Sequence, residues 1–115
     1  MSLQKPIDIF HEYVIHDVLG HIKGITSRKM FGGYGLYLDG AIFSIITDVD
    51  ELRFKVDDSN REQYEAIGST PFIYHGHKNR KPTIMNYYLI PKEIMEDRDT
   101  LHEWVEQSAA LSRKK

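Results

Sequence analysis

Apolar residues recur along this chain with two different periods, and the first is helical. Near the N-terminus they return every three or four residues, at Ile7, Phe10, Val14, Val18 and Ile22. This spacing predicts an amphipathic helix with one buried stripe. Pro6 suits the first turn, where a missing N–H costs nothing. Gly24 can adopt the left-handed conformation that ends a helix, so we expect the first helix to lie between these two residues.

The second period is two, and it is clearest on either side of Asp39-Gly40. Both central residues of a type I′ turn need positive φ, which Asp and Gly tolerate, so this dipeptide predicts a tight β-hairpin. An uninterrupted ladder from that turn pairs Leu38 with Ala41 and Tyr34 with Ile45. Since strand side chains alternate between faces, the residues expected in the core are Leu36, Leu38, Phe43 and Ile45.

Three further alternating or apolar runs predict strands at 52–56, 71–74 and 83–90. A short helix ending at Gly68 separates the first two of these runs, and a last helix opens at Pro91 and restarts near Asp97 or Asp99. That helix places Trp104, the only tryptophan, on its buried side. The predicted order is α-β-β-β-α-β-β-α. It indicates an α+β fold of two layers: a five-stranded, mostly antiparallel sheet with helices on one face.

Composition narrows the class of protein. The 115 residues, 41% hydrophobic and 28% charged, are typical of one globular domain. Zero cysteines exclude disulfides, cysteine-ligated metals and a thiol nucleophile. No window has the apolar length of a signal peptide or a membrane span, so we expect no membrane partner and a cytoplasmic location. The net charge of −2 does not by itself indicate a nucleic-acid partner.

The chain resembles the TfoX (Sxy) N-terminal domain family in several motifs that occur in the right order. They are MFGGYGLY at 30–37, DG at 39–40, FKVD at 54–57, GSTPFIY at 68–74, MNYYLIP at 85–91 and the start of the last helix from Asp97 to Trp104. The better-known members are bacterial regulators of natural competence. The resemblance therefore implies a regulatory module without catalysis, formed by one domain over 1–115 that lacks the C-terminal domain of the full-length members.

The sheet face away from the helices is the first candidate site. Alternation predicts that it carries aromatic, cationic and aliphatic side chains: Tyr37, Ile42, Ser44, Ile46, Arg53, Lys55 and Tyr88. Exposed isoleucines on such a face favour a protein partner or a homodimer. Aromatic and cationic groups together also occur on surfaces that bind single-stranded nucleic acid, which is the alternative interpretation.

The second candidate site is the polar loop between the last two predicted strands. Lys78, Arg80 and Lys81 concentrate positive charge there. A charged loop tip is most simply a solvated turn, but the same residues could contact phosphates. We favour protein contact over nucleic acid because the whole chain is slightly acidic.

No residue pattern predicts catalysis, a cofactor or a metal site. Gly32-Gly33-x-Gly35 has neither the preceding strand nor the following helix of a phosphate-binding loop. Its glycines more often mark a bulge or a close backbone approach. No serine or threonine lies in a nucleophile elbow. The sequence therefore predicts a non-catalytic interaction module.

Overall fold

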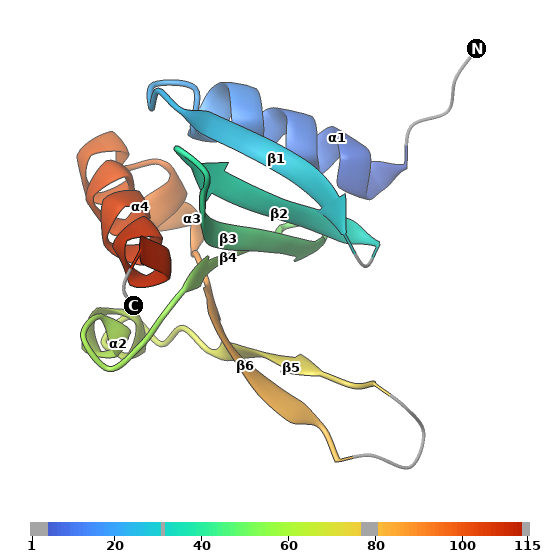
Figure 1. Ribbon diagram of the computed structural model, residues 1–115, viewed down its shortest axis with the longest axis vertical. Helices are drawn as coiled ribbons and strands as arrows, with labels where there is room; N and C mark the ends of the chain where they lie inside the picture. The colour runs from blue at the N-terminus through green and yellow to red at the C-terminus, as the bar shows by residue number, and fades with distance from the viewer. Residues whose placement is uncertain (1–4, 31, 77–80, 114–115) are drawn as a thin grey trace.

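The computed structural model describes residues 5–30, 32–76 and 81–113. Figure 1 shows one sheet with the longest helix packed against it and a two-stranded ribbon that extends away from the helices. The elements in chain order are α1 (Pro6–Tyr13), a π-helical turn η1 (Val14–Val18), β1 (Ile25–Met30), β2 (Gly33–Leu38), β3 (Ala41–Asp48), β4 (Glu51–Lys55), α2 (Arg61–Glu65), β5 (Pro71–Tyr74), β6 (Thr83–Leu89), α3 (Lys92–Met95) and α4 (Arg98–Arg113).

The predicted α+β class is confirmed, but the sheet has six strands where the sequence predicted five. The strand order is β1-β2-β3-β4-β6-β5, and every neighbouring pair is antiparallel. The strand that sequence reasoning missed is β1. Its two apolar residues, Ile25 and Met30, fall on opposite faces, and two charged residues lie between them. This edge strand therefore lacks the alternation by which strands are recognised.

The predicted turn between β2 and β3 is present, with φ of 49° at Asp39 and 85° at Gly40. Leu38 pairs with Ala41 as expected, but a bulge after Leu36 shifts the rest of the ladder, so that Tyr34 pairs with Ile46. The extra residue turns Ile46 into the core and leaves Ile45 half-buried on the other face. The prediction of a buried Phe43 is confirmed, and that of a buried Ile45 is wrong.

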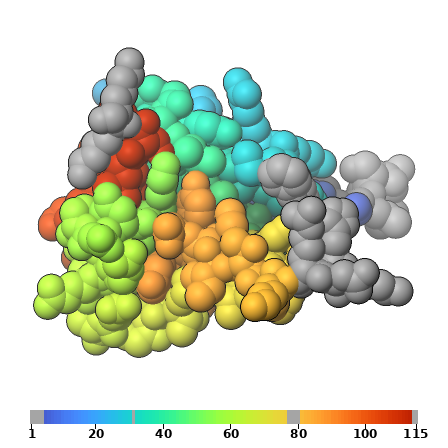
Figure 2. Space-filling view, turned by 60° about the horizontal axis from the view of Figure 1, so that its bottom comes forward, coloured from blue at the N-terminus to red at the C-terminus, as the bar shows by residue number. Residues whose placement is uncertain are grey.

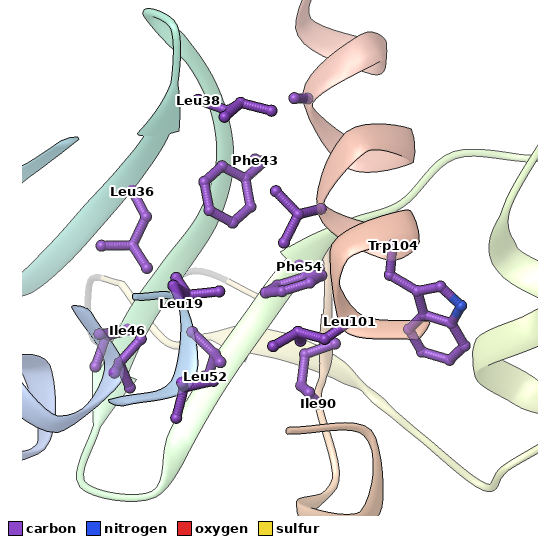
Figure 3. Close-up of a cluster of buried hydrophobic side chains, with 14 of the residues drawn as sticks. Leu19, Leu36, Leu38, Phe43, Ile46, Leu52, Phe54, Ile90, Leu101 and Trp104 are labelled. Carbon is purple, nitrogen blue, oxygen red and sulfur yellow. The ribbon is translucent and has the colours of Figure 1, made fainter. Parts of the chain in front are cut away.

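The core lies between the sheet and the N-terminal and C-terminal helices. Figure 3 shows Phe43, Phe54 and Leu101 meeting between the strands and α4, with Leu19 from the N-terminal segment beside them. The Phe43 and Phe54 rings meet edge to face, with their centroids 5.4 Å apart. Trp104 points from α4 toward α2, where its ring lies 4.5 Å from that of Tyr64. Its burial, predicted from the sequence, is confirmed at 7% exposure.

The end of α4 closes a gap in the sheet. The β3–β4 pairing ends at Ser44 and Phe54, so the backbone beyond these residues has no ladder partner in that direction. Ser108 Oγ donates a hydrogen bond to the Lys55 carbonyl (2.8 Å), and Ser112 Oγ donates one to the Ile42 carbonyl (2.6 Å). Two serine hydroxyls of α4 thus help to satisfy backbone carbonyls at this end of the sheet, and Asn60 Nδ2 also donates to the Lys55 carbonyl (3.2 Å).

Candidate interaction face

The sheet face opposite the helices is called here the open face, and the strand register defines it. Directly paired residues in an antiparallel sheet share a face. The register places Arg28 opposite Gly35, Gly35 opposite Ile45, Ile45 opposite Arg53 and Arg53 opposite Leu89. This row crosses five strands of the sheet. It brings together residues that lie more than 60 positions apart in the sequence.

Two arginine–aromatic pairs lie on the open face, one toward each side. The Arg28 guanidinium lies over the Tyr37 ring, 5.8 Å from its centroid, and the Arg53 guanidinium lies over Phe72 at 5.2 Å. Such pairs are attractive because the ring face is negative. Between them, half-buried aliphatic side chains form a strip that consists of Ile42, Ile45 and Leu89.

Arg53 is held firmly on this face. Its Nη1 donates to the Thr70 carbonyl (3.3 Å), and its Nη2 approaches a Glu51 carboxylate oxygen at 3.4 Å. The side chain is only 11% exposed. Its Nε–H is buried and has no acceptor among the described residues. These contacts hold the guanidinium group in a fixed position on the open face.

Two tyrosines lie near each other on the same face. Burial raises the pKa of Tyr87, and the nearby Tyr37 phenol raises it further. The Tyr87 phenol therefore stays neutral at physiological pH and can donate or accept a hydrogen bond. The open face thus offers aromatic rings, two guanidinium groups and phenol hydroxyls.

The structure places four of the predicted face residues on the open face: Tyr37, Ile42, Arg53 and Lys55. The expectation that Ser44 and Ile46 share it is wrong, since both are buried under the helices at 0% and 1% exposure. The β2–β3 bulge is the cause, because one additional residue exchanges the faces of everything beyond it. Ser44 Oγ instead donates to the Arg53 carbonyl at 2.7 Å.

Tyr88 also lies elsewhere, whereas Lys55 stays on the open face with its ammonium group drawn toward α4. Tyr88 pairs with Phe54 and is therefore on the helix-covered face, where its ring lies 5.8 Å from that of Tyr64. Lys55 is the last residue of β4, and its Nζ donates to Ser112 Oγ at 2.8 Å. The strand register nevertheless places Lys55 opposite Tyr87 on the open face, and the contact with Ser112 draws only its ammonium group toward α4. The expected outward placement is therefore wrong for Tyr88, whereas the register confirms it for Lys55.

Sequence reasoning missed several residues of the open face: Arg28, Ile45, Phe72, Met85, Tyr87 and Leu89. The three residues of β6 could have been placed there by alternation, because Thr83 to Leu89 is one regular strand. Arg28 could not, since its strand went unrecognised. Phe72 depends on a bulge after Pro71 that no local pattern signals.

The basic loop lies largely outside the described residues. Lys78 and Arg80 are not among them. Lys81 is described and is exposed. The anion-binding interpretation of this loop therefore remains a sequence-based prediction.

A polar cluster joins α1 to the sheet at the opposite edge. Tyr34 OH donates a hydrogen bond to an Asp8 carboxylate oxygen. That bond raises the pKa of Tyr34 to about 12 and lowers the pKa of Asp8. The His11 ring stacks on Tyr34 with centroids 3.7 Å apart, and its Nε2 lies 2.8 Å from Ser27 Oγ. Burial lowers the pKa of His11, against the opposing effect of the Glu12 and Asp8 carboxylates.

This cluster has the residue types of a catalytic site but the arrangement of a structural one. Ser27 lies in the middle of an edge strand, where no sharp turn presents its hydroxyl to a substrate. The adjoining pocket of about 320 Å³ is lined by Lys5, Lys29 and Asp8, whose mixed charges select no single ligand class. The hydrogen bonds of Ser27 and Tyr34 instead attach α1 to β1 and β2.

Within 5–30, 32–76 and 81–113, no three His, Asp or Glu side chains gather in a way that could hold a metal ion. No helix in the same ranges combines the length and apolar character needed to cross a membrane.

Comparison with known proteins identifies the family. The family model described as "TfoX N-terminal domain" matches residues 17–111, which include every strand of the sheet and nearly all of α4. The comparison with curated proteins gave no match. The family comprises regulatory domains of the competence type and is not a known enzyme family. Because the match spans most of the chain, this protein belongs to the TfoX N-terminal domain family.

Proposed function

We propose that this domain is a non-catalytic regulatory module that acts by binding another protein through its open face. Family membership supports a regulatory role of the competence type in general. The observation that carries the mode of action is the pair of arginine–aromatic contacts on either side of an aliphatic strip. Arginine and aromatic residues are enriched at the centres of protein interfaces, where they supply most of the binding free energy.

The same observation argues against the nucleic-acid alternative. Proteins that bind single strands stack bases on free aromatic ring faces. Here the Tyr37 and Phe72 rings are each covered on one face by a guanidinium group. The cationic groups of the face are thus already engaged with protein atoms, and the chain as a whole carries a net charge of −2.

Ile42→Glu tests this proposal, because it places a carboxylate in the aliphatic strip. The matched control is Val49→Glu, at the β3–β4 turn, where the valine is 38% exposed and lies off the open face. We expect a partner protein recovered from the native cell to survive nuclease treatment, to be lost with Ile42→Glu and to be retained with Val49→Glu. An unpaired buried charge is costly enough to abolish such a contact.

The nucleic-acid alternative makes a different prediction. Binding to single-stranded DNA or RNA would weaken with salt, with a log–log slope of about −0.7 per phosphate contact. Replacing Arg80 and Lys81 with Ala would then flatten that slope by roughly one to two units. Nuclease-sensitive recovery together with this salt behaviour would overturn the protein-binding proposal.

A further inference from the structure

The β5–β6 ribbon exposes an unusual amount of apolar surface. In the described ranges, eight large hydrophobic side chains are exposed, and four of them lie on this ribbon: Ile73 (47%), Tyr74 (52%), Ile84 (66%) and Met85 (37%). Figure 1 shows the ribbon extending away from the helices, and in Figure 2 its yellow and orange side chains lie on the molecular surface. Ile73 and Ile84 share one face of the ribbon, and Tyr74 and Met85 share the other, so both faces of this sheet edge are apolar, as is common at interfaces.

The ribbon also ends the sheet with an unprotected strand. β5 is the terminal strand in the order β1-β2-β3-β4-β6-β5. The opposite edge, β1, carries the exposed charges Arg28 and Lys29, which are a common protection against edge-to-edge pairing. The β5 segment Phe72-Ile73-Tyr74 carries no charge, and its neighbours Thr83-Ile84-Met85 carry none either. Pro71 protects only the first position of the strand.

We propose that β5 pairs antiparallel with β5 of a second copy of this chain, across a two-fold axis at Ile73. The two six-stranded sheets then join into one sheet of twelve strands. This inference concerns the sheet edge and does not depend on the protein partner proposed for the open face.

The side chains favour a second copy over an unrelated partner, because the strand is complementary to itself. Pairing about Ile73 places this residue opposite the partner's Ile73 and places Phe72 opposite the partner's Tyr74. Directly opposed aromatic and β-branched pairs stabilise antiparallel strands. Within one copy, Ile84 lies opposite Ile73. The paired edges therefore align four isoleucines in one row across the junction.

The side chains on the other face of the junction also favour pairing of two copies. Phe72 lies opposite Met85, and Tyr74 lies opposite Thr83, within each ribbon. Pairing of the two edges extends each of these pairs to the aromatic side chain contributed by the partner. All four exposed apolar residues of the ribbon are then at or next to the junction. A segment without charges offers nothing for a charged peptide to recognise, whereas it matches its own copy at every position.

The proposal is tested with the complete chain, by placing a charged residue at Ile73 on the two-fold axis. We expect the wild type to form dimers in sedimentation experiments at concentrations up to roughly 1 mM, the range in which weak contacts become populated. A short edge-to-edge contact buries little surface, so a weak dimer is expected. Ile73→Lys and Ile73→Glu should each be monomeric, because each opposes like charges across the axis. Their equimolar mixture should recover the dimer, since lysine then faces glutamate.

Ile9→Lys is the matched control, since Ile9 is 56% exposed on α1 and far from the ribbon in the fold. It should dimerise like the wild type, and circular dichroism should show that all variants are folded. A wild type that stays monomeric over this range, or that pairs only with added peptides, would overturn the proposal. A dimer that survives Ile73→Lys, or an equimolar mixture that remains monomeric, would also overturn it, because the contact would then lie elsewhere.

Discussion

The two hairpins β2–β3 and β5–β6 have similar residue compositions, but the apolar side chains of the first are buried and those of the second are largely exposed. Both are rich in aromatic, β-branched and other apolar residues. In the first, Leu36 and Phe43 are completely buried beneath α4 and the N-terminal helix. In the second, Ile84 is 66% exposed, and no helix in the described ranges covers it.

The difference shows that an apolar pattern predicts a strand without saying what covers it. The first hairpin occupies the middle of the sheet, where two helices of the same chain supply the cover. The second continues past the last helix, so its apolar face must be covered by something outside the chain or remain in water. The first hairpin thus carries core residues that stabilise the fold, whereas the second leaves large apolar side chains exposed.

The largest expected effect comes from the centre of the first hairpin. Phe43→Ala should lower the free energy of unfolding by about 3–5 kcal/mol, as is usual when a buried aromatic side chain is removed. Phe43 is 0% exposed and contacts the Phe54 ring, so its removal leaves a cavity lined by apolar side chains. Urea denaturation followed by circular dichroism measures this change. A loss below about 1 kcal/mol would mean that the hairpin is not where the stability lies.

The turn of the same hairpin should be the next most sensitive position. Gly40 has a φ of 85°, and a Cβ added to it would contact nothing within 4 Å, so only backbone strain opposes a side chain there. Gly40→Val should cost about 1–2 kcal/mol, because a β-branched residue is disfavoured in the left-handed region. Gly40→Asn is the control and should cost less, since Asn tolerates that region. Equal losses for the two variants would point to a steric cause instead.

These two positions also show what the sequence could predict. The Asp39-Gly40 turn follows from local backbone preference, and it was predicted with its burial pattern for Leu36, Leu38 and Phe43. The faces of Ile45 and Ile46 were exchanged, because a bulge depends on how the sheet twists under its helices. That twist cannot be predicted from the local sequence. Edge strand β1 was missed for a related reason: a strand with one partner and a mixed face needs little alternation.

The candidate site was predictable to a smaller extent than the fold. Tyr37, Ile42 and Arg53 were placed on the open face because each lies in a regular stretch close to a turn. Phe72 and Leu89 are brought to Arg53 only by the pairing of β4 with β6 and of β6 with β5, across long sequence separations. Such neighbours follow from strand order, which alternation along one strand cannot supply.

A third prediction concerns how α1 is attached to the first hairpin. The hydrogen bond to Asp8 raises the pKa of Tyr34 from its ordinary value of 10.0 to about 12. The folded state therefore keeps the phenol proton at pH values where the unfolded chain loses it. The resulting stability is fully present below about pH 10 and is lost as the pH rises toward 12.

Tyr34→Phe should remove this part of the alkaline loss, while the other tyrosines continue to titrate. The measurement is the difference in urea midpoint between wild type and variant across this alkaline range. That difference should be largest near neutral pH and should shrink toward pH 12. A difference that stays constant with pH would show that the Tyr34–Asp8 bond does not control the titration. The attachment of α1 would then depend on the His11 stack and on packing.

The smallest expected change in stability is that of a substitution on the exposed hairpin β5–β6, and it tests the contrast between the two hairpins directly. Ile84→Thr keeps a β-branched side chain in β6 and should change the free energy of unfolding by less than about 0.5 kcal/mol in dilute, monomeric protein. The same chemical change at Ile46, which is 1% exposed in β3, should cost several times more, because it buries a hydroxyl and removes core packing. Urea denaturation of both variants at one low concentration gives the ratio directly. If the two losses were equal, the ribbon would be covered within a single chain, and the contrast between the two hairpins would disappear.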